Sequence, residues 1–376
     1  MAFRPSVRRP VCDDRLDRVD LRNDPQAWAN ALGISKESTE LCVDSEIIDL
    51  HVDSFIWTRV FGYDLCRRHG RGLLGARYFH QADLPRLEAA GVTGAVWSIT
   101  TNPLNNADER VDVLRHNLAQ LSSTLEGSGR ATIARTRSEY LAARSAGKHA
   151  AFVGLQGGNA IDRDAYAIDA LPDGLVVRVT LLHLTNSSLG TTSSPLAGSH
   201  DDGLTNRGRD LVRALNARRI FVDLAHVSRR GFWDAVETSD PAQPLLVSHT
   251  GVSGVFPHWR NIDDNQLRAV ADRGGTVGIM FQAHFLGLAP VHAQHVVDHL
   301  EHIVKTAGED HASIGSDWDG WIVPPRDLTT CVQLPRLVDL MLRRGWSPAR
   351  IKKILADNFL RCLSMLRPEP SPPPSL

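Results

Sequence analysis

Short apolar runs of strand-like composition alternate with segments of helical periodicity along most of this chain. The predicted strands are residues 46–50, 94–99, 150–155, 176–181, 220–224, 245–248, 276–280 and 313–315. The helical patterns include residues 110–125, 208–217, 264–272 and 293–307, and two final helices are expected over 334–344 and 348–363. Eight repeats of a strand followed by a helix predict an α/β fold, a parallel (β/α)8 barrel of the TIM type.

The ends of the chain differ in composition from the predicted barrel domain, which spans residues 46–366. Residues 1–45 are polar and irregular, with a short helical pattern over 25–32, and we interpret them as an N-terminal extension. Residues 367–376 are rich in proline and serine, and we expect a disordered tail. The first residues lack the apolar run of a secretory signal, and we expect no segment that spans a membrane.

Polar side chains follow six of the eight predicted strands directly. They are His51 and Asp53 after the first strand, Gln156 after the third, His183 after the fourth, His226 after the fifth, His249 after the sixth and Asp317 after the eighth. Because the carboxyl ends of barrel strands meet at one face, residues far apart in the sequence are expected to share one pocket.

The chemistry of this set indicates a metal-dependent hydrolase. A strand has a period of two, so His51 and Asp53 project from the same face and can share a divalent ion. His226 and His249, on neighbouring strands, can hold a second ion. Zinc suits nitrogen and carboxylate ligands, and Mn²⁺ and Fe²⁺ are alternatives. Two close ions would activate a water molecule, with Asp317 as the general base.

Any single histidine in such a position is more often a packing residue than a ligand, so the hypothesis depends on the shared position in the repeat. Asp49 and Asp223 lie within strands and are interpreted as structural, and Asp319 as a supporting carboxylate near the site. The histidines without ligand spacing, interpreted as surface or packing residues, include His69, His80, His116, His149 and His258.

Composition and charge indicate which class of partner and which cellular compartment to expect. The 376 residues are 42% hydrophobic and 23% charged, with a formal net charge of −1. This balance gives no reason to expect nucleic acid or an anionic membrane as a partner, so a small-molecule substrate is expected. The five cysteines are odd in number and lack CxxC spacing, which fits reduced thiols in a cytoplasm better than a disulfide framework.

Several motifs together resemble the membrane (renal) dipeptidase family of the amidohydrolase superfamily, over residues 47–359. The clearest is Val-Asp-Leu-Ala-His-Val-Ser at 222–228, which is similar to the family's IDLAHVS. The other segments are His51-Val52-Asp53 with Trp57 (HNDLPW), 154–159 (GxEGGH), 181–186 (LTLTHxxN), 248–250 (SHS), 260–262 (RRN), 315–320 (GSDFDG) and 356–359 (GxNxL).

The resemblance implies a binuclear zinc centre in a dipeptidase. Its implied ligands are His51 and Asp53 for one ion and His226 and His249 for the other. Family members cleave dipeptides, tolerate D-residues at the second position and are commonly dimers, so a homodimer is expected.

The resemblance also implies roles toward the substrate. His183 would contact the tetrahedral oxyanion, and Asp317 would be the proton shuttle. Arg260 would bind the substrate's C-terminal carboxylate, for which a planar guanidinium offers two parallel hydrogen bonds.

Gln156 is the main departure from the family pattern, because it stands where the family has its metal-bridging glutamate. A neutral amide bridges two ions poorly and leaves one more positive charge in the site. We therefore expect a weakened binuclear site, a single ion or no hydrolysis, and we expect Gln156→Glu to raise zinc occupancy and dipeptidase activity. Asn159 replaces the family's usual histidine, and the residues after Asp53 also differ, which alters the rim of the pocket.

The favoured function is a zinc-dependent, dipeptidase-like hydrolase that cleaves a dipeptide or a related amide with a free carboxylate. One alternative is a tailoring enzyme that acts on a peptide-derived metabolite with a modified, single-ion site. Another is a non-hydrolytic binding protein. The presence of Asp317 argues against the last, since a binding protein needs no proton shuttle.

Overall fold

The computed structural model describes residues 16, 19–72, 74–102, 104–164, 166–198 and 200–369. The predictions for the first fifteen residues and for the tail at 370–376 lie outside these described residues.

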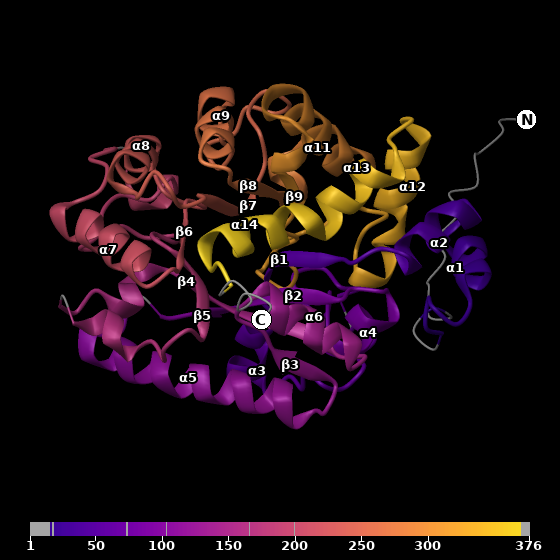
Figure 1. Ribbon diagram of the computed structural model, residues 1–376, viewed down its shortest axis with the longest axis horizontal. Helices are drawn as coiled ribbons and strands as arrows, with labels where there is room; N and C mark the ends of the chain where they lie inside the picture. The colour runs from indigo at the N-terminus through magenta and orange to yellow at the C-terminus, as the bar shows by residue number, and fades with distance from the viewer. Residues whose placement is uncertain are drawn as a thin grey trace, which may run out of the picture.

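Eight parallel strands form a barrel at the centre of the molecule (Figure 1). In order around the sheet they are β1 (Ile48–Val52), β2 (Gly94–Thr100), β4 (His149–Gln156), β5 (Val176–Thr180), β6 (Phe221–Asp223), β7 (Leu246–Thr250), β8 (Thr276–Ile279) and β9 (Ala312–Ile314). The first and last strands approach each other past the end of β9, where Asp53 N donates to Trp318 O (2.8 Å) and Asp317 N to His51 O (3.0 Å). The predicted (β/α)8 barrel is confirmed.

Helices surround this sheet (Figure 1). They are α1 (Pro25–Leu32), α2 (Lys36–Val43), α3 (Phe55–Phe61), α4 (Leu84–Ala89), α5 (Ala107–Gly127), α6 (Arg137–Ser145), α7 (Asn206–Ala217), α8 (Arg229–Thr238), α9 (Asp264–Asp272), α10 (Ala283–Leu286), α11 (Ala293–Ala307), α12 (Pro335–Arg343), α13 (Pro348–Lys352) and α14 (Asn358–Leu366). Polar caps define several of their starts: Asn106 and Asp263 each form a capping box with the residue three positions further on.

All eight predicted strands are present, within a few residues of their predicted bounds. One further strand, β3 (Ala131–Ile133), pairs with β4 outside the barrel order and was not predicted. The predicted helices at 264–272 and 293–307 coincide with α9 and α11. The helix predicted over 348–363 is two helices, α13 and α14, joined by a π-helical turn at Lys353–Asp357.

The described part of the N-terminal extension packs on the barrel domain. Trp28 of α1 is fully buried, and its indole nitrogen donates to Val19 O (3.1 Å). Ser35, which caps α2, donates its backbone N–H to Asp339 of α12 (2.8 Å).

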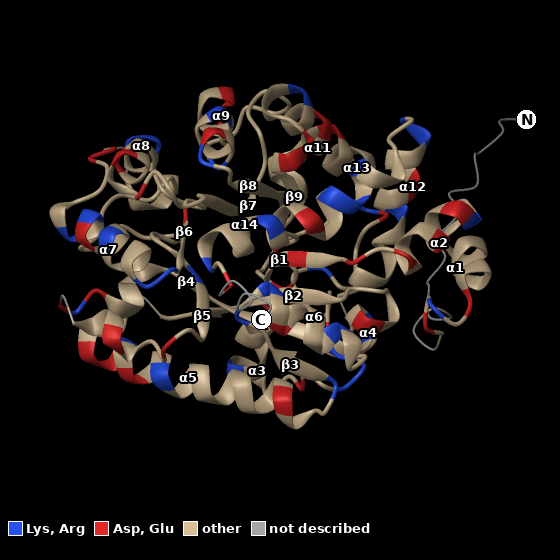
Figure 2. Cartoon of the chain, in the orientation of Figure 1, with Lys and Arg blue, Asp and Glu red and all other residues tan. Residues whose placement is uncertain are grey.

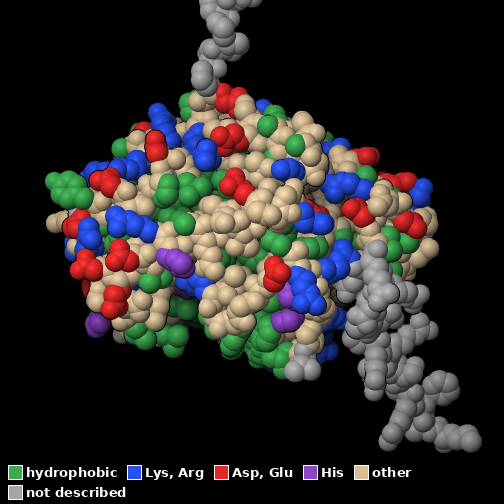
Figure 3. All heavy atoms as spheres, turned by 90° about the horizontal axis from the view of Figure 1, so that it is seen from below, with side chains coloured by type: hydrophobic (Ala, Val, Ile, Leu, Met, Phe, Trp, Pro, Cys, Tyr) green, Lys and Arg blue, Asp and Glu red, His purple; other side chains and the backbone are tan. Residues whose placement is uncertain are grey.

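Charged residues lie mostly on the helices and loops around the sheet (Figure 2). Both signs are interspersed on the face seen in Figure 3, as expected for a net charge of −1, and hydrophobic side chains gather along its lower edge.

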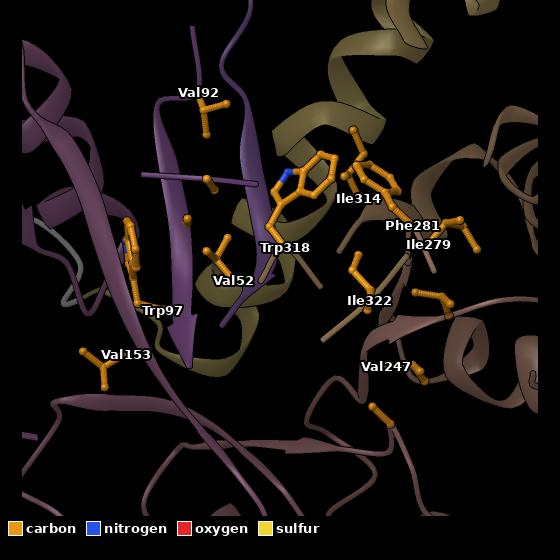
Figure 4. Close-up of a cluster of buried hydrophobic side chains, with 14 of the residues drawn as sticks. Val52, Val92, Trp97, Val153, Val247, Ile279, Phe281, Ile314, Trp318 and Ile322 are labelled. Carbon is orange, nitrogen blue, oxygen red and sulfur yellow. The ribbon is translucent and has the colours of Figure 1, made fainter. Parts of the chain in front are cut away.

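Apolar side chains pack on both sides of the strands. Near the carboxyl ends, Trp318 packs edge-on against Phe281 with ring centroids 5.0 Å apart (Figure 4). In a second cluster, Phe359 of α14 lies 5.2 Å from Phe152 and 6.0 Å from Phe221, measured between ring centroids. Helix α14 therefore packs onto strands β4 and β6 through one aromatic side chain.

We expect Phe359→Ala to lower the free energy of unfolding by about 3–5 kcal/mol, because it leaves a cavity among buried rings. Phe61→Ala is the matched control: Phe61 is 71% exposed, so its loss should change stability by less than about 1 kcal/mol. Denaturant unfolding of both variants measures this, and equal effects would contradict the packing role of Phe359.

Candidate functional site

The carboxyl-terminal ends of the barrel strands bring the predicted histidines into contact. The ring centroids of His51 and His249 are 3.8 Å apart, and those of His226 and His249 are 4.8 Å apart. His183 lies edge-on to His226 at 4.8 Å. Four residues from strands spread over some 200 positions of sequence thus form one cluster, as the strand-end pattern predicted.

The carboxylates join the same cluster. His51 Nε2 lies 3.3 Å from Asp53 Oδ1 and 3.6 Å from Asp317 Oδ1. Ligand atoms of His51, His249 and Asp317 all lie within 4.8 Å of one another, close enough to share one metal ion. Burial and the charge of Asp53 raise the pKa of Asp317 well above its usual range, with Arg260 acting in the opposite direction.

The backbone is strained at two of these positions. His226 and Asp317 both have a φ of 64°, a left-handed conformation that is uncommon for residues other than glycine. Hydrogen bonds hold both: Ser193 N donates to His226 O (2.7 Å), and Gly320 N donates to Asp317 O (3.0 Å). Strain of this kind gathers at functional sites, where it fixes the direction of a side chain.

His226 and His249 present donor atoms that fit a divalent cation. Their Nε2 atoms are 2.8 Å apart, a hydrogen bond in which one ring donates its N–H to the other, and both residues are buried. Burial lowers the pKa of each imidazole well below its usual value, so both rings are neutral. Two neutral imidazole nitrogens that face each other are a common start of a zinc site.

A buried arginine, which the sequence analysis did not single out, lies directly beneath the site. Arg178 on β5 is fully buried and donates through Nη2 to His51 Nδ1 (2.6 Å). Its Nη1 donates to Asp223 Oδ2 (3.0 Å) and Thr180 Oγ1 (2.8 Å). The sequence carried one sign of this residue: Arg178 is a charged residue in the middle of the apolar strand β5. Because barrel strands are buried on both faces, a charge at that position needs a buried partner.

Asp223 is the centre of a hydrogen-bond network below the histidines. Besides Arg178, its carboxylate accepts from the hydroxyls of Thr180 (2.6 Å) and Ser248 (2.6 Å). It also accepts from the backbone N–H groups of Ser248 (2.9 Å) and Ala225 (3.1 Å). These contacts agree with the interpretation of Asp223 as structural.

Gln156 lies beside the predicted ligands His51 and Asp53 and also contacts His183. With its amide nitrogen toward Asp53, that nitrogen donates its two hydrogens to Asp53 Oδ2 (2.8 Å) and Thr100 Oγ1 (3.1 Å), and no hydrogen is left for His51 Nε2 at 3.2 Å. Its oxygen then accepts from His183 Nε2 (3.2 Å). In this orientation the atom nearest Asp53 is a hydrogen-bond donor, which cannot ligate a cation.

Arg260 reaches the cluster from the loop after β7. It is 3% exposed, and its Nη2 donates to His249 O (2.6 Å). Its buried Nε has no hydrogen-bond partner within the described residues. Burial lowers the pKa of Arg260 to about 10, with Asp317 acting in the opposite direction, so the guanidinium stays charged at neutral pH.

The carboxylate Asp319 supports the loop structure. It accepts from the hydroxyl of Ser54 and from the backbone N–H groups of Gln81 (2.7 Å) and Ala82 (3.2 Å). Among the other histidines, His149 accepts from Trp97 Nε1 (3.3 Å) inside the core, a packing position as predicted.

The comparisons with known proteins agree with this geometry. The family model described as "Membrane dipeptidase (Peptidase family M19)" matches residues 35–367. The chain belongs to this family. It is therefore a hydrolase of the amidohydrolase superfamily, and the family is one of metallopeptidases. Within the described residues, no helix combines the length and apolarity needed to cross a membrane.

Solved structures of the family share the fold. A metallopeptidase from Rhodobacter sphaeroides, liganded with a phosphinate mimic of the dipeptide L-Ala-D-Ala, is 25% identical with a TM-score of 0.74, over 86% of this chain and 99% of that chain. Dipeptidase AC, a metallopeptidase of family M19, is 26% identical with a TM-score of 0.74, over 85% of this chain and 98% of that chain. The probable dipeptidase PvdM from Pseudomonas aeruginosa has a TM-score of 0.77 at 18% identity, over 88% of this chain and 98% of that chain.

We expect zinc to stabilise the chelator-treated protein, because an ion held by His226 and His249 would bind the folded state only. Free zinc at a hundred times its Kd adds about 2.7 kcal/mol. Replacing both histidines with Asn should abolish the shift in Tm, whereas His116→Asn, at an exposed helical histidine, should keep it. A shift of equal size in the double variant would rule out this pair as the zinc site.

Proposed function

We propose that this protein is a zinc-dependent, dipeptidase-like hydrolase that cleaves a dipeptide, or a related amide with a free carboxylate. The observation that carries the proposal is the joint position of Asp317 and Arg260 beside the histidine pair. Arg260 bonds to the backbone of His249, and Asp317 lies 3.6 Å from His51. Family membership supports the same activity.

A divalent ion held by His226 and His249 would supply Lewis acidity, which lowers the pKa of a water molecule and polarises the scissile carbonyl. Asp317 is the proposed base for the proton of that water. Its raised pKa makes it a better proton acceptor than an ordinary aspartate, and it can then pass the proton to the leaving amine.

His183 and Arg260 are proposed to hold the substrate. Loss of solvation lowers the pKa of His183 to about 4, so its ring is neutral. Its Nε2–H, which faces the Gln156 oxygen at 3.2 Å, is the group proposed to donate to a developing oxyanion. The buried Nε of Arg260, which has no partner among the residues that the structure describes, gives its guanidinium a donor that a substrate carboxylate would satisfy.

Zinc remains our proposal for the native ion, on the basis of the imidazole donors. The homodimer and the cytoplasmic location also remain predictions.

We expect Arg260→Lys to reduce kcat/KM at least tenfold for a dipeptide with a free carboxylate, because an ammonium group lacks the planar fork. Arg115→Lys, on the exposed face of α5, is the control and should be neutral. The measurement is steady-state kinetics of the wild type and both variants.

The same role predicts that the wild-type protein prefers a dipeptide to its C-terminal amide. Equal turnover of the two forms would exclude Arg260 as the carboxylate anchor. Binding of carboxylate ligands with zinc present but no turnover of L,L or L,D dipeptides would favour the alternative of a tailoring enzyme on a peptide-derived metabolite.

A further inference from the structure

The contact between Arg178 and His51 determines which ring nitrogen of His51 carries a proton. An arginine has donors and no acceptor, so His51 Nδ1 must accept the bond from Arg178 Nη2 at 2.6 Å. A neutral imidazole has one acceptor, and its proton then lies on Nε2. Nε2 is the atom that faces Asp53 (3.3 Å) and Asp317 (3.6 Å), both of which can accept that proton.

This arrangement removes His51 from the set of ready metal ligands. A ligand nitrogen needs a free lone pair, whereas His51 Nε2 presents an N–H group. An ion bound there would require either a histidine anion or the displacement of the guanidinium. Arg178 is fully buried and also held by Asp223, so displacement would break that buried ion pair.

The same network prepares His249 in the opposite way. The Ser248 hydroxyl donates to Asp223 Oδ2 (2.6 Å), so the Ser248 oxygen is left to accept from His249 Nδ1–H (2.8 Å). The lone pair of His249 is then on Nε2, which accepts the N–H of His226 Nε2 at 2.8 Å. The Nδ1 of His226 has no hydrogen-bond partner within the described residues, so this proton can move to Nδ1 and leave a lone pair on Nε2 for an ion. One side of the cluster thus offers a lone pair to a cation, and the other side offers a proton.

The charges around His51 also disfavour a second cation. Gln156 contributes no negative charge where the family pattern has a glutamate, and Arg178 adds a positive charge beside His51. Relative to a site with a glutamate at position 156 and no cation at position 178, these two features add two positive charges, one of which Asp223 offsets. Arg178 lies outside the motifs that carry the family resemblance.

We propose that the centre binds one divalent cation, on His226 and His249, and that the guanidinium of Arg178, from the Nδ1 side of the His51 ring, prevents a second ion from binding at His51 Nε2 and Asp53. His51 is then a positioning residue that directs its Nε2–H toward Asp53 and Asp317. The inference rests on the proposed function for the identity of the ion, zinc, and it adds the number and location of the ions. It also implies that Gln156→Glu alone leaves the guanidinium in place.

The first test is the zinc content of the full-length protein, after chelation and equilibrium dialysis against zinc. The wild type is expected to hold one ion per chain. His226→Asn and His249→Asn should each lose it, whereas His51→Asn should retain it. Zero or two ions in the wild type, or loss of the ion in His51→Asn, would overturn the proposal.

The second test restores the ion site at His51 and Asp53. Gln156→Glu with Arg178→Gln is expected to bind two zinc ions per chain, and Gln156→Glu with Arg178→Lys, the matched control that keeps a cationic donor, is expected to bind one. Asp223 keeps four other donors in both, so we expect folded proteins, checked by circular dichroism. A folded glutamine variant with one ion, or a lysine variant with two, contradicts the role of Arg178.

These tests separate this inference from the proposed function. One bound ion without dipeptide turnover would leave the inference standing and remove the dipeptidase activity. Dipeptide turnover with two bound ions would support the dipeptidase activity and overturn the inference of a single ion. If neither double variant folds, the zinc content of the wild type and the three histidine variants decides the question.

Discussion

The buried ion pair between Arg178 on β5 and Asp223 on β6 connects the strands beneath the site. Arg178 also donates to His51 on β1 and Ser98 on β2, and Asp223 accepts from Ser248 on β7. Removing one partner of such a pair typically costs about 3–5 kcal/mol, because the other charge is left buried and unpaired. This single network therefore fixes five strands relative to one another at the level where the histidines emerge.

The network also sets the chemistry of the rings above it. A cationic donor under His51 and a hydroxyl acceptor under His249 give the two imidazoles opposite proton positions. The left-handed backbone at His226 and Asp317 then directs these side chains into the same cluster. In this account the metal-binding capacity depends as much on the residues below the ligands as on the ligands themselves.

The barrel could be predicted because its eight strands are buried on both faces and read as apolar runs with polar residues at their ends. The site residues could be placed at one mouth for the same reason. Strand β3 was not predicted because its three residues lie outside the barrel order, whereas β6 and β9, which are equally short, lie within it. The role of Arg178 could not be read from the sequence, since its effect on His51 depends on a hydrogen-bond direction that only the folded geometry defines. The sequence alone showed that Gln156 weakens a two-ion site. It did not show that Arg178 contacts His51, which is the second reason to expect a single ion.

The most direct test of this account is a crystal structure of the wild-type protein soaked with zinc, with anomalous scattering measured at the zinc edge. We predict one anomalous peak per chain, within about 2.1 Å of His226 Nε2 and His249 Nε2. The guanidinium of Arg178 should remain within hydrogen-bond distance of His51 Nδ1. Two peaks, with the second on His51 and Asp53 and Arg178 moved away, would contradict the account.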